Sequence, residues 1–151
     1  MSNRLNIEQK RAKTAFDFAE KGNKAAFENN GQHYKPESFG TNATKVPMYI
    51  KTNGLGNTVA FIYSKRTKDD EKKGKAGTSS NSKNAWSLIY EQIRFWLEDE
   101  EHSIIAEKLK AEPQKELIKH ITELETEEYR SVTKEVLALF SWIKRFVKDE
   151  Q

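Results

Sequence analysis

Residues that could perform acid–base or metal chemistry are few in this sequence, and they lie far apart. Its three histidines lack the HxxxH and HExxH spacings that put two imidazoles on one metal ion; they are His33, His102 and His120. The acidic run 98–101 could bind Mg²⁺, but consecutive helical residues point in different directions, which favours solvated acids at a helix boundary. No serine lies in a nucleophile-elbow motif. The sequence therefore predicts a protein that is not an enzyme and has no metal and no cofactor.

Two glycines raise the question of a phosphate-binding loop. Gly54 and Gly56 precede an apolar run in TNGLGNTVAFIY, residues 52–63. A dinucleotide fingerprint needs a third glycine, a preceding strand and a distant acid, and a Walker loop ends in Gly-Lys-Ser/Thr; the segment has neither pattern. We interpret the pair as a corner between two helices, with Gly54 in the left-handed conformation that ends the first helix.

Cationic side chains on the last expected helix form the clearest polar pattern. They lie with Ser141 in one narrow angular sector, because whole helical turns separate them, and we call them the basic line: Arg130, Lys134, Arg145 and Lys148. A row of this kind suits a phosphate backbone, which is bound through charge and not through base identity. An ordinary solvated helix face is the other interpretation, and it stays open here.

Apolar residues that recur at helical spacing predict the elements that position these side chains. The expected helices cover 5–29, 41–52, 56–62, 86–97, 103–109, 113–124 and 126–147. The first should end at the cap Asn29-Asn30-Gly31, and Pro47 and Pro113 should lie within the first turn of their helices. A short buried strand is the alternative for VAFIY, 59–63.

Two segments lack apolar periodicity and are expected to be loops. Residues 32–40 connect the first two helices, and 65–84, rich in Lys, Ser and Gly, form an exposed and mobile loop. The lysines of the longer loop could contact RNA, although a solvated connection is the simpler interpretation. The sequence predicts an all-α fold, a compact bundle of about six helices in a single domain over 1–151.

Composition limits the class of protein further. The chain has 151 residues, with three Trp, five Tyr and eight Phe to fill a core, and no cysteine for disulfides or thiolate metal sites. Its start is too charged for a signal peptide, and no apolar run approaches membrane-spanning length, so we expect a cytoplasmic protein without a membrane partner. A net charge of +3 permits a nucleic-acid partner.

Two blocks of the sequence together resemble one family. The first is NGLG (53–56) leading into Ala60-Phe61, and the second comprises YRSVT (129–133) and LALFSWIKRF (137–146). This combination is similar to the small subunit of the Cmr complex, the type III-B CRISPR effector that silences RNA under the direction of a guide RNA. The first helix matches loosely, and the segments 65–84 and 98–125 match through helix content alone.

The resemblance implies an all-α subunit without a catalytic centre. Copies of it stack into an inner filament along the backbone subunits, and its basic surface follows the target RNA while neighbouring subunits cleave. The implied partners are other Cmr subunits, copies of itself and the guide and target RNA, with no small-molecule substrate. The resemblance also implies that Leu55 fills the core at the glycine corner.

These observations define candidate contacts and competing functions. The basic line is expected to contact phosphates, and a second-rank set lies near the glycine corner: Lys45, Lys51, Lys65 and Arg66. The alternative is a protein-only adaptor, in which aromatic helices dock partners and the basic line only keeps the protein soluble. A metal-dependent nuclease is the third hypothesis, and it requires Mg²⁺-dependent RNA cleavage by the purified chain.

Overall fold

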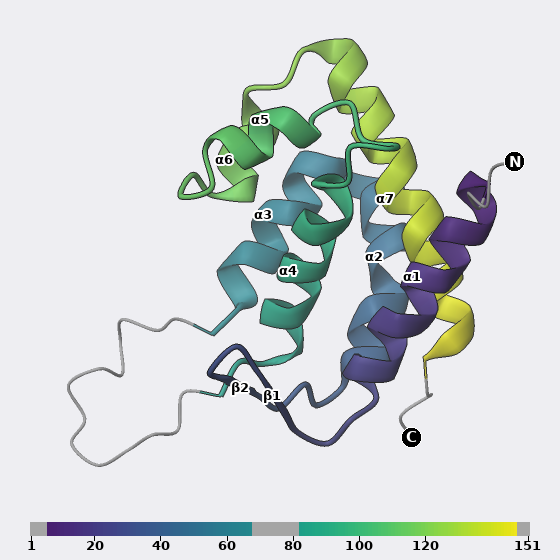
Figure 1. Cartoon of the computed structure of the whole chain (residues 1–151), viewed down its shortest axis with the longest axis vertical. Helices are drawn as coiled ribbons and strands as arrows, with labels where there is room; N and C mark the ends of the chain where they lie inside the picture. Colours follow the sequence, from purple (N-terminus) through teal and green to yellow (C-terminus); the bar gives the residue numbers. More distant parts are fainter. Residues whose placement is uncertain (1–5, 68–81, 148–151) are drawn as a thin grey trace, which may run out of the picture.

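Seven helices and one short hairpin make up the described part of the chain, residues 6–67 and 82–147 of a computed structural model (Figure 1). In chain order they are α1 Ile7–Gly22, β1 Phe27–Asn29, β2 Gln32–Tyr34, α2 Phe39–Asn53, α3 Leu55–Lys65, α4 Ala85–Leu97, α5 Ala106–Ala111, α6 Leu117–Thr122 and α7 Thr126–Phe146. The helical prediction is confirmed, and the run 59–63 lies in helix α3, not in a strand. Most of the loop predicted over 65–84 lies outside the described residues.

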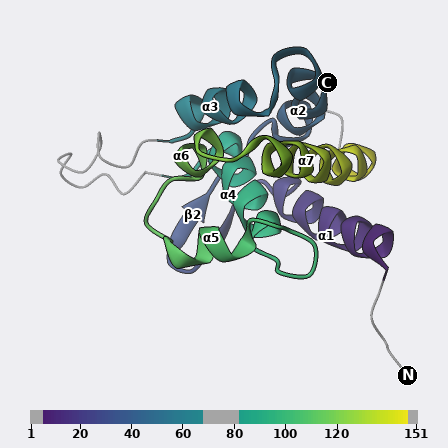
Figure 2. The same cartoon turned by 90° about the horizontal axis from the view of Figure 1, so that it is seen from above.

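The helices pack around one shared core. Helix α7 lies between α1 and α2, and α3 packs against α2, α4 and α6. Seen from above, α2 and α3 lie together along one side of the molecule, and α1 and α5 lie on the opposite side (Figure 2). The largest fully buried side chains include Trp96, Phe39 and Phe140, one each from α4, α2 and α7. Aromatic residues therefore supply much of the core, as expected from the composition.

The first helix ends earlier than its sequence predicts. Helix α1 stops at Gly22, and the following chain forms an antiparallel hairpin in which Phe27 pairs with Tyr34. Asn30 and Gly31 form its two-residue turn with φ of 51° and 79°. Positive φ at both positions defines a type I′ turn, for which Asn-Gly is the preferred sequence. The prediction that these residues cap a helix was wrong, because the same dipeptide also closes a hairpin.

The predictions that Pro47 and Pro113 lie within the first turn of their helices were also wrong. Pro47 is buried in the middle of α2, where it cannot donate a hydrogen bond to the carbonyl of Ala43. Pro113 precedes α6, which begins at Leu117. Pro47 is tolerated inside α2 because it packs in the core. Val46, Pro47 and Ile50 are all buried, and the free energy gained by their burial outweighs the loss of one helical hydrogen bond.

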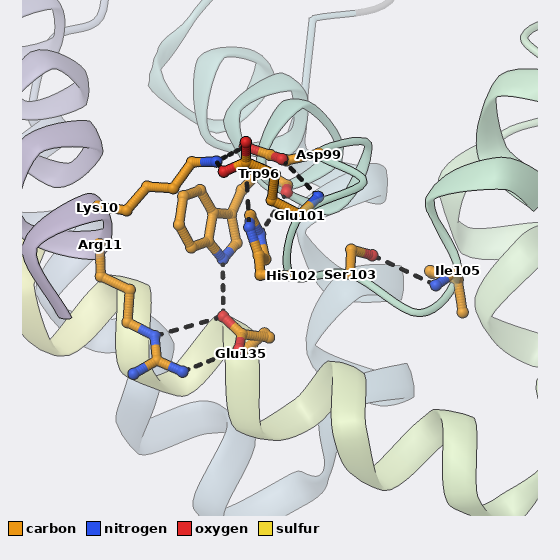
Figure 3. A network of polar contacts seen from close by, with 9 residues as sticks. All are labelled: Lys10, Arg11, Trp96, Asp99, Glu101, His102, Ser103, Ile105 and Glu135. Atoms are coloured by element: carbon orange, nitrogen blue, oxygen red, sulfur yellow. Dashed lines mark hydrogen bonds and ion pairs between the residues drawn. The ribbon is translucent and has the colours of Figure 1, made fainter. Parts of the chain in front are cut away.

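A polar network fixes α7 against α1 and α4 (Figure 3). Glu135 of α7 accepts hydrogen bonds from Arg11 Nη2 at 2.8 Å and from Trp96 Nε1 at 3.2 Å. The Arg11 and Glu135 side chains are only 14% and 12% exposed, so each charge depends on the other. The His102 ring stacks on Trp96 with centroids 3.7 Å apart, and its Nε2 lies 2.9 Å from the Trp96 carbonyl oxygen. This network sets which face of α7 points to solvent.

His102 should make folding stability depend on pH. Its side chain is 3% exposed, and burial lowers the pKa of its imidazole below 6.5, although the carboxylates of Glu135 and Asp99 oppose the shift. The unfolded chain therefore takes up a proton near pH 6.5 that the folded chain does not. Since the unfolded state binds more protons, the free energy of unfolding decreases as pH falls through that value, until the folded pKa is reached.

Urea unfolding at about pH 7.5 and 5.5, one unit either side of the ordinary histidine pKa, measures this effect. The unfolding midpoint of the wild type should fall at the lower pH, and His102→Gln should remove most of that fall. His33→Gln, at an exposed position of the hairpin, is the matched control. An equal fall in the wild type and in His102→Gln would contradict the assignment.

Candidate nucleic-acid interface

The glycine pair forms a corner between α2 and α3, as predicted. The Gly54 N–H donates to the Ile50 carbonyl at 2.8 Å and ends α2. The Gly54 carbonyl then accepts from the Thr58 N–H at 3.1 Å and from its hydroxyl at 2.8 Å, which starts α3. Leu55 between the helices is fully buried, as the resemblance implied. The N–H and the carbonyl of Gly54 are therefore both hydrogen-bonded within the corner.

The conformation of Gly54 differs from the prediction. Its φ is 89°, but its ψ is 160°, which lies outside the left-handed helical region. This region of backbone space is open essentially to glycine alone, because any Cβ clashes there. Asparagine, which tolerates the left-handed helical region, therefore gains no advantage at this position.

Gly54→Asn and Gly54→Ala should each lower the free energy of unfolding by about 1–3 kcal/mol, the cost of one strained backbone position. Urea denaturation of both variants measures the loss. Gly31→Asn is the control, because its φ of 79° lies in an exposed turn with open space around it, and it should cost less. A Gly54→Asn variant much milder than Gly54→Ala would show that the corner is left-handed after all.

A hydrogen bond joins this corner to the start of α7. The Gly56 N–H donates to the Tyr129 hydroxyl at 2.7 Å, and a Cβ at position 56 would lie 3.3 Å from that oxygen. The bond connects the NGLG block directly to the YRSVT block. Lys51 lies in the last turn of α2, just before the corner, and Arg130 follows Tyr129, the residue of α7 that the corner contacts.

The α2–α3 segment carries only positive charge. Residues 38–68 contain no Asp or Glu. Lys45, Lys51 and Lys65 are exposed, and no described residue forms an ion pair with them. Arg66 is half-buried with its guanidinium 4.1 Å from the centroid of the Tyr63 ring. These four cations are therefore unneutralised by the carboxylates of the described chain.

Not all of these cations lie near the glycine corner. Lys51 is in the last turn of α2, close to the corner. Lys65 and Arg66 lie at the other end of α3, about 15 Å along the helix at 1.5 Å per residue. The expectation that all four gather at the corner was wrong, because α3 carries the chain away from it. The candidate surface is extended and not a single cluster.

The basic line lies on the outward face of α7. Arg130, Lys134 and Arg145 are exposed, and none forms an ion pair with a described residue. They point away from the buried face of α7, which includes Val136 and Ile143. Lys148 lies outside the described residues.

Cations on the α5–α6 side of the molecule are, by contrast, neutralised within the chain. Lys108 lies 2.8 Å from Glu128, and Lys110 lies 3.1 Å from Glu100. The remaining pairs on this side are Lys115 with Glu112 and Glu123, and Lys119 with Glu123. Sequence reasoning missed this difference, because it depends in part on pairs between separate elements, such as Lys108 of α5 with Glu128 of α7. Exposed cations without an ion-pair partner in the described chain remain on α2, α3 and α7, and also at Lys13 and Lys21 of α1.

The chemistry-bearing residues of the sequence mostly have structural roles. Residues of the acidic run form ion pairs: Glu98 with Arg94 at 2.8 Å, and Asp99 with Lys10 at 2.7 Å. His102 packs in the polar network, and buried His120 has its Nε2 3.4 Å from the Glu112 carbonyl. No group of three or more potential ligands that could hold a metal ion occurs among the described residues.

No helix within residues 6–67 and 82–147 has the length and apolar character to cross a bilayer. The described chain is thus a small, mainly helical protein with an extended cationic surface and no metal-ligand cluster in the part described. Its sequence matches the family model described as CRISPR-associated protein (Cas_Cmr5) over residues 7–150, and the chain belongs to that family. It is therefore a small subunit of the type III-B CRISPR (Cmr) complex, and the resemblance is confirmed.

Proposed function

We propose that this chain is the non-catalytic subunit that contacts the target RNA backbone in a guide-RNA-directed Cmr complex during antiviral defence. Copies of the chain stack into a filament along the backbone subunits in the cytoplasm, and other subunits cleave the RNA. One observation supports RNA contact above the others: residues 38–68 carry no carboxylate, and Lys45, Lys51 and Lys65 are exposed without an ion-pair partner in the described chain.

The physical argument concerns which cations are available to phosphates. A lysine already paired with a carboxylate must lose that partner before it can neutralise a phosphate. The lysines of α2 and α3 have no such partner to lose. RNA bound there releases condensed counterions, and no ion pair within the chain is broken. The Gly56–Tyr129 bond holds the start of α7, which carries Arg130, against the corner that follows Lys51.

The protein-only adaptor remains a second candidate, and exposed apolar side chains favour it. Phe95 is 65% exposed, Ile104 57% and Phe16 52%. Side chains of this type commonly lie at contacts with neighbouring subunits. Such contacts are also needed for stacking, so they are compatible with either function, and RNA contact must be tested directly.

The test compares complexes reconstituted with and without this subunit. The affinity for a single-stranded target RNA is measured across a salt series, using a complex whose nuclease subunit is inactive. With the subunit present, the log–log dependence on salt should be steeper by about 0.7 for each added phosphate contact. An identical slope in the two complexes, with the remaining subunits assembled, would favour the adaptor.

A further inference from the structure

A groove that the proposed phosphate contacts do not explain lies between α2 and α3. It is open to solvent, has a volume of about 510 Å³ and is lined by Tyr49, Asn53, Asn57, Thr58 and Phe61. Its volume falls within the range of ordinary small-ligand pockets. The groove lies on the segment without carboxylates, beside the glycine corner.

Aromatic side chains form one part of the groove. The Phe61 ring is 36% exposed although it is large and apolar. It meets Tyr49 edge-on at a centroid distance of 5.4 Å and Trp86 at 5.5 Å. These neighbours fix the orientation of Phe61, and a partly exposed ring held in this way offers a surface on which a planar group can stack.

Amide groups form the polar part of the groove. The Asn57 Nδ2 donates to the Asn53 carbonyl at 3.1 Å, which holds the Asn57 side chain in place. Its Oδ1, and the whole side-chain amide of Asn53, have no hydrogen-bond partner among the described residues. An amide presents a donor beside an acceptor, the pattern that the edge of a nucleobase also presents. The Thr58 hydroxyl is already used by the Gly54 carbonyl.

The charge around the groove selects among possible occupants. Neither α2 nor α3 carries a carboxylate, and the Lys65 ammonium lies 5.6 Å from the centroid of Phe61. An anionic ligand with planar groups therefore fits better than an apolar peptide helix. From the aromatic surface, the free amides and the surrounding lysines, we infer that the groove binds one unstacked nucleobase of the single-stranded target RNA.

This inference rests on the proposed function, which it extends from the phosphates to a base. Stacking is tolerant of sequence because every base has a π-face, so the site would hold a base without selecting the target. The lysines of α2 and α3 would bind the phosphates on either side. Each copy of the subunit in the complex would thus fix the strand at one nucleotide.

Abasic nucleotides test the inference in the assembled, cleavage-inactive complex. Single-stranded target RNAs are prepared with one abasic nucleotide at successive positions, and their affinities are measured. With the wild type, one position for each copy of the subunit should lose about 5- to 140-fold in affinity, the effect of removing one stacked base. Phe61→Leu, present in every copy, should lower the affinity for intact RNA by at least that factor. With this variant, the abasic positions should cause no further loss.

Two control variants separate failure of this inference from failure of the proposed function. Phe27→Leu removes a partly exposed ring from β1, outside the groove, and should leave the abasic pattern unchanged. Lys51→Gln should flatten the salt dependence by about 0.7 per copy of the subunit if phosphates are contacted. A flattened slope with no abasic effect would overturn the base site alone, whereas no effect in either experiment would overturn both proposals. If the Phe61→Leu subunit no longer assembled into the complex, and the abasic RNAs bound the wild-type complex as tightly as intact RNA, the groove would hold a neighbouring protein. That outcome would overturn the base site.

Discussion

Replacing Lys45, Lys51, Arg130 and Lys134 with glutamine lowers the affinity of the assembled complex for target RNA and flattens its salt dependence. If all four side chains neutralise phosphates, the log–log slope should fall by about three units per copy of the subunit, at about 0.7 for each contact. Folding should change little, since these residues are exposed on helices and glutamine has a helix propensity similar to that of lysine and arginine. The slope is obtained by measuring the affinity for target RNA at a series of salt concentrations, with each variant incorporated in the complex.

The chain provides a matched control for this experiment. Glutamine substitutions at Lys108, Lys110, Lys115 and Lys119 remove the same net charge from lysines that carboxylates already neutralise. Exposed ion pairs contribute only about 0–1 kcal/mol each, so this variant should fold as well. Its salt slope should equal that of the wild type. Equal flattening in the two variants would mean that net charge alone, and not the α2, α3 and α7 surface, determines RNA binding.

Gly22→Ala is expected to destabilise the protein even though alanine is the better helix former. Gly22 lies in the last turn of α1, and a Cβ there would be 2.1 Å from Cδ2 and 2.3 Å from Cγ of Phe39. The Phe39 ring is fully buried, so it cannot move into solvent. Overpacking of this kind costs about 1–3 kcal/mol, whereas helix propensity alone would stabilise the variant by about 1 kcal/mol.

Urea denaturation of single and double variants checks this contact. Phe39→Leu makes space at position 22, so the double variant Gly22→Ala, Phe39→Leu should lose less stability than the two single losses added together. A stabilised Gly22→Ala variant would show that α1 and α2 do not approach this closely. An exact sum of the two losses would show that the alanine does not act through Phe39.

The sequence predicted the long helices better than the short elements. Helices α4 and α7 carry broad apolar faces, which helical periodicity identifies directly. The end of α1 had no local signal except Gly22, whose role depends on Phe39, a residue of another helix. The Asn30-Gly31 dipeptide fits both a helix cap and a hairpin turn, and only the pairing of Phe27 with Tyr34 distinguishes them.

The candidate interface was predicted in part, for a similar reason. Helical spacing is sufficient to place Arg130 and Lys134 on one outward face of α7. Whether a cation is already neutralised depends on partners such as Glu128 for Lys108, 20 residues away in sequence. The groove at Phe61 could not be predicted either, because it needs two helices to meet at the angle that the Gly54 corner imposes.

The central claim is that the RNA strand passes over α2 and α3. Ultraviolet cross-linking of target RNA to the assembled complex, followed by mass spectrometry of the cross-linked peptides, tests it most directly. We predict cross-links in Phe39–Asn53 and Leu55–Lys65, with Tyr49 and Phe61 among the modified residues. Cross-links confined to Ala106–Ala111 and Leu117–Thr122, or absent from this subunit while its neighbours are labelled, would contradict the account.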